Sequence, residues 1–147
     1  MAGIREFSRE ERLERACLRV AMVIRGMWEE KGDSDSRLFD WLIPDDLTVV
    51  GRSHAYDGVG RREHVVPRKV IADECHKMLK AEQSDRALAD YIKHHLRIVR
   101  ISHEECQRLD QKLQLGLRQS MPTDWKIGDD VYARLTAAGI EWSPLPA

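Results

Sequence analysis

The sequence predicts an α+β fold of mainly helical content with one small antiparallel sheet. Long segments with apolar residues at helical spacing fill most of the chain. Short β-branched runs bounded by turn residues interrupt them, and two Ser-x-x-Glu patterns indicate where helices begin. The 147 residues contain no repeat, no low-complexity tract and no flexible linker, so we expect a single domain over residues 1–147.

The N-terminal region, residues 1–33, predicts an amphipathic helix. Ser8 and Glu11 form a capping-box pattern, and apolar residues then recur at helical spacing until Gly32, which predicts the end of the helix. Glu and Arg alternate on the opposite side and can pair along the surface. We expect the apolar stripe to be buried in the core rather than to bind a partner.

The next segment predicts one short helix and two short strands. Residues 36–43 form the helix, because apolar residues cluster there and Pro44 ends the pattern. Residues 47–50 and 63–66 each contain β-branched residues and predict strands, and the segment between them is rich in glycine. The two strands are expected to pair as a hairpin with a long, mobile loop.

Two helices and a third strand follow, and they complete a predicted core over residues 47–116. The segment 68–94 has helical periodicity in two parts and predicts a helical insertion. Residues 96–101 predict a strand, and a second capping-box pattern starts a helix over 103–115. Strand 63–66, strand 96–101 and this helix therefore follow one another in the order β, β, α.

The C-terminal region, residues 117–147, predicts a turn and a short helix. The turn is expected at the letters MPTDW, and the helix runs from about Asp130 to Ala138. Gly139 is the predicted C-terminal stop.

Charge is unevenly distributed along the chain. The formal net charge is -1, but residues 52–102 hold 11 Lys or Arg against 7 Asp or Glu, a local balance of +4. A basic segment in an acidic protein indicates a local anion site, although such a division also arises by chance, and both interpretations stay open.

Cysteine usage and hydropathy indicate the compartment. Cys17, Cys75 and Cys106 are isolated and odd in number, which predicts neither a disulfide framework nor a thiolate zinc site. No run approaches the roughly 18 apolar residues of a membrane span, and the first residues lack an apolar signal core. We therefore expect a cytoplasmic protein without a membrane partner.

Histidines are concentrated around the β, β, α segment. His64 lies at the first of its strands, His94 and His95 precede the next strand, and His103 falls in the first turn of the following helix. These positions are neighbours if the two strands pair.

The letters EHVVP, residues 63–67, resemble the D/E-H-I/V-x-P opening of HNH-type nucleases, whose fold is a ββα-metal unit. In that family the histidine is the general base, and the acid and a histidine on the following helix hold one divalent metal at the scissile phosphate. The resemblance implies metal-dependent phosphodiester hydrolysis of nucleic acid, with His64 as base. It further implies that Glu63 and His103 hold a Mg²⁺ or Mn²⁺ ion.

The chain departs from this family in three respects. The family uses an asparagine to orient the base, whereas this sequence contains no asparagine. His95, or its neighbour His94, is the candidate replacement. The insertion between the strands is also long, and the glycine-rich turn that often follows the proline in these nucleases is missing.

A second resemblance covers roughly residues 60–140. The succession of EHVVP, LRIVRISHEECQRLD, GLRQSMPTDW and YARLTAAGI is similar to small proteins of bacteriophages and prophages with an HNH-like core. It implies action in the cytoplasm of a bacterial host.

Two functional hypotheses remain after the sequence is considered. In the first, the chain is an HNH-like endonuclease, and four basic residues contact the phosphate backbone of nucleic acid. In the second, the HNH-like core is catalytically inactive, and the chain is a phage-encoded binding protein that inhibits or redirects a host nucleic-acid-processing or defence complex. It would use acidic surface of the N-terminal helix or the C-terminal segment. The four basic residues of the first hypothesis are Arg61, Arg62, Arg68 and Lys69. Under the second hypothesis they would be an ordinary solvated cluster.

Overall fold

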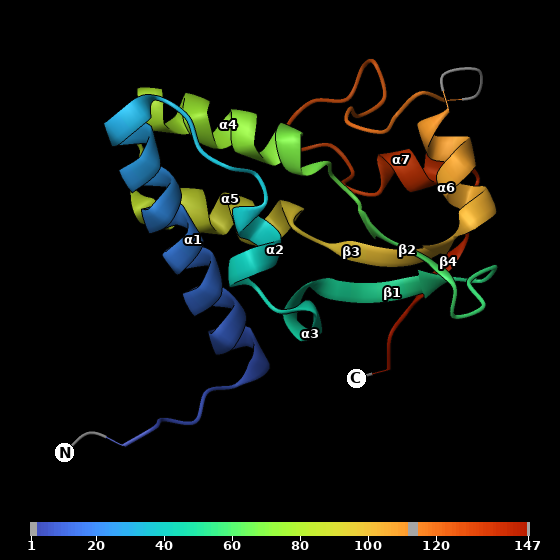
Figure 1. Ribbon diagram of the computed structural model, residues 1–147, viewed down its shortest axis with the longest axis horizontal. Coiled ribbons are helices and arrows are strands. Elements are labelled where there is room, and N and C mark those ends of the chain that lie inside the picture. The colour runs from blue at the N-terminus through green and yellow to red at the C-terminus, as the bar shows by residue number, and fades with distance from the viewer. Residues whose placement is uncertain (1–2, 112–114, 147) are drawn as a thin grey trace.

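A computed structural model describes residues 3–111 and 115–146, and its helices and strands are shown in Figure 1. The predicted α+β class is confirmed. Helices α1, α4 and α5 lie together on one side of the molecule, and the sheet with α6 and α7 occupies the other side. In chain order the elements are α1 (Arg9–Lys31), α2 (Leu38–Leu42), α3 (Asp45–Thr48), β1 (Val49–Ser53), β2 (Gly60–His64), α4 (Arg68–Lys80), α5 (Asp85–His95), β3 (Ile98–Ser102), α6 (His103–Asp110), α7 (Ala133–Ala137) and β4 (Trp142–Pro144).

The sheet is mixed and has the strand order β2-β3-β1-β4. Strand β3 pairs antiparallel with β2 and parallel with β1, and β4 adds an antiparallel edge to β1. The central position of β3 follows from its sequence, because Ile98, Val99 and Ile101 are all buried. Strand β2 has the letters GRREH, and such a charged strand is suited to an edge.

The predicted hairpin between residues 47–50 and 63–66 is wrong. Strand β3 lies between β1 and β2, so the two strands never pair. Both also lie at shifted positions, because residues 45–48 form the helical turn α3 and because β2 ends at His64. The physical reason is that β3, the most apolar strand, buries both of its edges by pairing on each side.

The predicted order β, β, α is present as β2, β3 and α6. The β2–β3 ladder runs from the pair Gly60 and Ser102 to the pair His64 and Ile98. Ser102 then forms the predicted capping box with Glu105, and α6 continues to Asp110. Leu113, in the last part of the predicted helix, lies outside the described residues.

The N-terminal helix and the insertion pack together as the helical half of the core. Ser8 and Glu11 form the predicted capping box of α1, and Gly32 ends it with the left-handed φ of 69°. The stripe of α1 is buried, as predicted, and it packs against α5. The three cysteines are buried free thiols. Within residues 3–111 and 115–146, no helix has the length and apolar character required to cross a membrane.

The C-terminal region forms a shorter helix than predicted and one unpredicted strand. The helix α7 covers only Ala133–Ala137, and Gly139 follows it with a φ of 66°, as a C-terminal stop requires. Strand β4 has only three residues, so no alternation of apolar and polar residues reveals it in the sequence.

Replacement of two glycines by alanine should change stability in opposite directions. A Cβ atom at Gly60 would overlap the carbonyl oxygen of Ile101, so β2 would have to separate from β3. Gly60→Ala should therefore lower the free energy of unfolding by about 1–3 kcal/mol. Gly26→Ala, in the middle of α1 with open space around its Cβ, should raise it by about 0.5–1 kcal/mol. Urea unfolding measures both, and equal effects at the two sites would contradict the β2–β3 register.

Candidate functional site

Strand β2 directs its side chains to two different environments. Because side chains alternate along a strand, Arg61 and Glu63 lie on one face of the sheet, and Arg62 and His64 lie on the other. The first face, which we call the inner face, is covered by α6 and α7. The second, which we call the outer face, borders α2 and α3. Since β2 is an edge strand, a ligand at this edge can meet residues of both faces.

On the inner face, Glu63 is part of a buried ion-pair network. Its Oε1 lies 2.8 Å from Nη1 of Arg134, and its Oε2 accepts a hydrogen bond of 2.7 Å from Nε of Arg61. Arg61 also binds both carboxylate oxygens of Asp110, at 2.5 and 2.9 Å. This hydrogen bond from Arg61 is the main reason why the pKa of Asp110 lies below its ordinary value.

Arg134 is fully buried, and all of its donor groups are used. Besides Glu63, it donates to the carbonyl oxygen of His64 at 2.7 Å and to the carbonyl oxygens of Leu117 and Arg118. A buried guanidinium is tolerated only when it is paired and hydrogen-bonded in this way. Glu63 is therefore a structural counter-ion. Two guanidinium groups beside its carboxylate would repel a divalent cation.

On the outer face, Asp40 holds His64. Oδ1 of Asp40 lies 3.2 Å from Nε2 of His64, and Oδ2 accepts a hydrogen bond of 2.6 Å from Arg68. Arg62 donates to the same carboxylate at 3.3 Å. Burial alone would raise the pKa of Asp40, but the hydrogen bond to His64 and the charges of His64, Arg68 and Arg62 outweigh it. The pKa is lowered to about 2, so this carboxylate stays ionised.

The surroundings of His64 limit what its imidazole can do. Its Nε2 is engaged by Asp40, while its Nδ1 is buried and has no hydrogen-bond partner among the described residues. A general base needs one free ring nitrogen within reach of the water that it deprotonates. Asp40 occupies Nε2, and the buried Nδ1 does not reach solvent. Neither ring nitrogen of His64 is therefore free to deprotonate a water in this arrangement.

The structure does not bring the two predicted metal ligands, Glu63 and His103, and the predicted base His64 together. Ser102, which precedes His103, pairs with Gly60, at the opposite end of the ladder from His64. Four residues along a strand separate these ends by about 13 Å. His103 is exposed at the start of α6, and no group of three His, Cys, Asp or Glu residues in the described part of the chain is placed to hold a metal ion. A metal held by Glu63 and His103 beside His64 as the base therefore does not fit this arrangement.

His95 lies outside this site. It is buried at the end of α5, where its Nδ1 lies 2.8 Å from the carbonyl oxygen of Tyr91 and its ring contacts the ring of Trp125. Burial is the main cause that lowers its pKa. The ring interactions of His95 are with Tyr91, His94 and Trp125, so Asp40 and not His95 is the residue that orients His64.

Sequence reasoning missed Asp40, Arg118 and Arg134. Asp40 and Arg134 contact β2 residues that are far away in the sequence, and Arg118 reaches the β2 edge from a distant segment, so no local pattern connects the three to β2. The only signal for Asp40 is that a charged residue interrupts the apolar letters LFDWLI.

The predicted phosphate-binding residues do come together. They line one pocket of about 260 Å³ at the β2 edge, which we call the basic pocket. The pocket adjoins the start of α4, where Pro67 is the N-cap and no side chain caps the first turn. The basic residues that line it are Arg61, Arg62, His64, Arg68, Lys69 and Arg118.

Most cations of the basic pocket already have carboxylate partners. Arg62 pairs with Asp45 at 2.7 Å in addition to Asp40, and Lys69 pairs with Asp73 at the same distance. The single charge of Asp40, however, is shared by Arg62, His64 and Arg68. Arg118 forms no salt bridge within the part of the chain that the structure describes. The pocket therefore keeps an excess of positive charge.

Part of the acidic surface of the N-terminal helix, one of the two surfaces that the second sequence hypothesis offers, is engaged within the chain, whereas Glu29 and Glu30 are exposed. Glu10 and Glu14 both pair with Lys93 of α5, and Glu11 is engaged with Ser8 in the capping box. A host-protein partner stays a prediction.

Comparison with known proteins returned no match. None of the family models, curated proteins or solved structures that were searched is similar to this chain.

Removal of the Arg134 guanidinium should destabilise the fold strongly. Arg134→Met removes one of the two counter-ions of the buried Glu63 and leaves the carbonyl oxygens of His64 and Leu117 without their donor, and breaking such a buried pair costs about 3–5 kcal/mol. Arg86→Gln, at an exposed arginine at the start of α5, should change stability by less than about 0.5 kcal/mol. Chemical denaturation of the two variants tests this, and a loss below about 1 kcal/mol for Arg134→Met would contradict the anchoring role.

Asp40 should make stability depend on pH in the acid range. Its folded pKa of about 2 lies below the ordinary value of 3.8, so its contribution is complete above pH 4 and is lost as the pH falls towards 2. Asp40→Asn removes this titration. The difference in unfolding free energy between the parent and Asp40→Asn should therefore shrink as pH falls from about 4 to 2. A pH-independent difference would show that the carboxylate is not held in this way.

Proposed function

We propose that this protein binds the phosphate backbone of nucleic acid through the basic pocket and does not hydrolyse it. The observation that carries the proposal is the convergence of Arg61, Arg62, Arg68, Lys69 and Arg118 on one pocket. Guanidinium groups suit phosphate oxygens because they offer several donors in a fixed plane.

The start of α4 supports the same ligand. Its first N–H groups have no side-chain cap, and no acidic residue lies in the first turn. Such a helix end favours negative charge because of the exposed N–H groups and the helix dipole. Arg68 and Lys69 belong to this turn, so a phosphate at the pocket would meet backbone donors and side-chain cations together.

The carboxylates around the pocket position the arginines rather than exclude an anion. Asp110 holds Arg61 through two parallel hydrogen bonds, and Asp40 and Asp45 hold Arg62. Because a guanidinium has five donors, each arginine keeps N–H groups for a further acceptor. Arg118, which has no such partner among the described residues, is the cation most available to a phosphate.

Metal-dependent hydrolysis is the second candidate, and two observations favour it. The β2, β3 and α6 elements follow in the order of a ββα unit, and Asp40 orients His64 as the family's asparagine orients its base. The ion pairs of Glu63 and the position of His103 oppose it. No reaction step through a metal follows from the present arrangement.

Arg118→Gln gives the cleanest test of the binding proposal, since it removes a cation without leaving a carboxylate unpaired. The variant should bind a labelled 20-nucleotide DNA and its duplex more weakly than the parent does. Its slope of log affinity against log salt should be smaller by about 0.7–0.9, because one phosphate contact is lost. Fluorescence anisotropy at several salt concentrations measures this, with Arg86→Gln as the matched control. No binding by the parent protein would sink the proposal.

The same protein preparation tests metal-dependent hydrolysis, the second candidate function. Plasmid and single-stranded DNA are incubated with Mg²⁺ and with Mn²⁺, beside His64→Ala. Cleavage by the parent and none by the variant would replace the binding proposal with hydrolysis.

A further inference from the structure

Three arginines lie directly opposite one another on neighbouring strands. Arg62 of β2 pairs in register with Arg100 of β3, and Arg100 pairs in register with Arg52 of β1. Residues that face each other across a sheet project from the same side. The three side chains therefore form a row across the outer face, which we call the arginine row. Two strand spacings separate its ends by about 10 Å.

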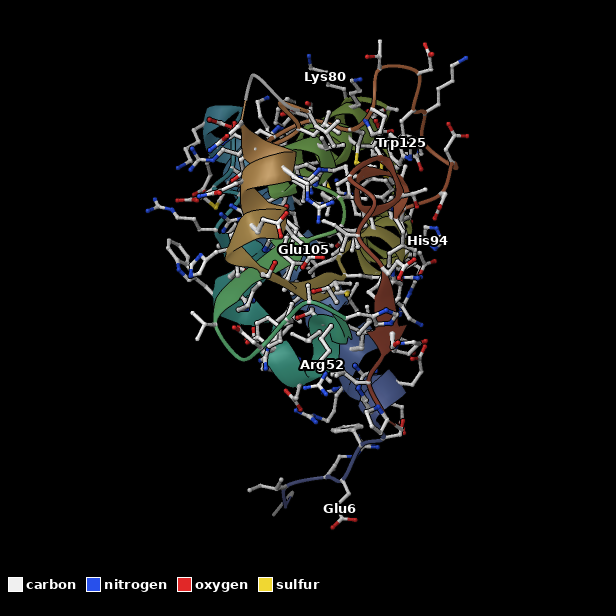
Figure 2. All side chains as sticks on the ribbon, turned by 90° about the vertical axis from the view of Figure 1, so that its right-hand side faces the viewer. Glu6, Arg52, Lys80, His94, Glu105 and Trp125 are labelled. Carbon is white, nitrogen blue, oxygen red and sulfur yellow. The ribbon has the colours of Figure 1, made fainter. Side chains whose placement is uncertain are left out.

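The arginine row is not explained by stability. Like charges directly opposite each other on a sheet are destabilising. Arg62 is compensated by Asp40 and Asp45, but Arg52 and Arg100 are exposed, with no salt bridge or hydrogen bond of their guanidinium groups within the described ranges. Figure 2 shows Arg52 on the opposite side of the sheet from Glu105, so α6 does not cover it. An anion from outside the chain would supply the missing partner.

A hollow of about 760 Å³ lies beside Arg100 on the same face. Its apolar wall is formed by Val49, Val50, Leu145 and Pro146, and Arg9 also lines it. Two carboxylates border the hollow, but Asp45 pairs with Arg62 and Asp46 pairs with Arg12. Apolar surface next to unpaired guanidinium groups suits a ligand with both a flat apolar part and a phosphate.

We propose that a single strand of nucleic acid crosses the outer face along the arginine row, with phosphates on Arg52 and Arg100 and a base or sugar in the hollow beside Arg100. This rests on the proposed function and specifies its ligand, because Arg62 joins the row to the basic pocket. The strand runs across the β-strands and turns around the β2 edge into that pocket.

The turn around the edge is the reason to infer a single strand. Arg62 and Arg61, which both line the basic pocket, project from opposite faces of the sheet. A backbone that contacts the row and the pocket must therefore bend sharply within a few nucleotides. Duplex DNA resists such bending, since its persistence length is about 50 nm, whereas a single strand is flexible.

The double variant Arg52→Gln/Arg100→Gln tests the inference in the full chain. With a labelled 20-nucleotide single strand, the slope of log affinity against log salt should fall by about 1.4, which is about 0.7 for each lost contact. The thermal unfolding midpoint should stay the same or rise, because like-charge repulsion is relieved. Arg86→Gln, which removes an exposed arginine at the start of α5, should change neither quantity.

The binding measurements give different results if the inference fails and if the proposed function fails. If Arg118→Gln weakens binding but the double variant leaves affinity and salt slope unchanged, the arginine row is not part of the path. Equal affinity for a 20-base-pair duplex, with the same dependence on Arg52 and Arg100, would overturn the single-strand assignment. If the parent binds neither DNA, the proposed function and the inference both fail.

Discussion

The buried pair of Arg134 and Glu63 is the constraint on which the rest of the structure depends. Arg134 joins α7 to the edge strand β2 and to the backbone that follows α6, because it donates to Glu63, to His64 and to Leu117. Burial of either charge alone would cost several kcal/mol. The C-terminal region is thereby tied to the β2 edge, and Arg118 is carried to the pocket by the same segment whose carbonyl oxygens Arg134 binds.

This anchoring explains why Glu63 and His64, which are neighbours in the letters EHVVP, do not share a metal site within the described part of the chain. In a strand, neighbouring side chains face opposite sides, so Glu63 and His64 enter separate networks. Glu63 is neutralised by Arg61 and Arg134, and His64 is held by Asp40. A carboxylate that serves as counter-ion in a core cannot also attract Mg²⁺ or Mn²⁺ without leaving buried arginine charge uncompensated. The letters EHVVP are thus compatible with a structural role for each of their polar residues.

Local features were predictable from the sequence, and long-range ones were not. Both capping boxes, at Ser8 and Ser102, depend on residues three positions apart, and both helices begin there. The predicted hairpin was wrong because strands compete for pairing with β1. Strand β3 buries more apolar surface than β2 and therefore takes the place beside β1. The basic residues near β2 were identified, but Asp40 and Arg134 lie too far along the chain for spacing to reveal their contacts with it.

Charge pairing also determines where a polyanion can approach a protein of net charge -1. Carboxylates near β2 are engaged by arginines, so their negative charge is cancelled locally, while Arg52, Arg100 and Arg118 have no salt bridge among the described residues. These three cations lie on the outer face and at the β2 edge. A phosphate backbone is attracted to guanidinium groups whose charge no carboxylate cancels, so the three arginines favour this surface for its approach.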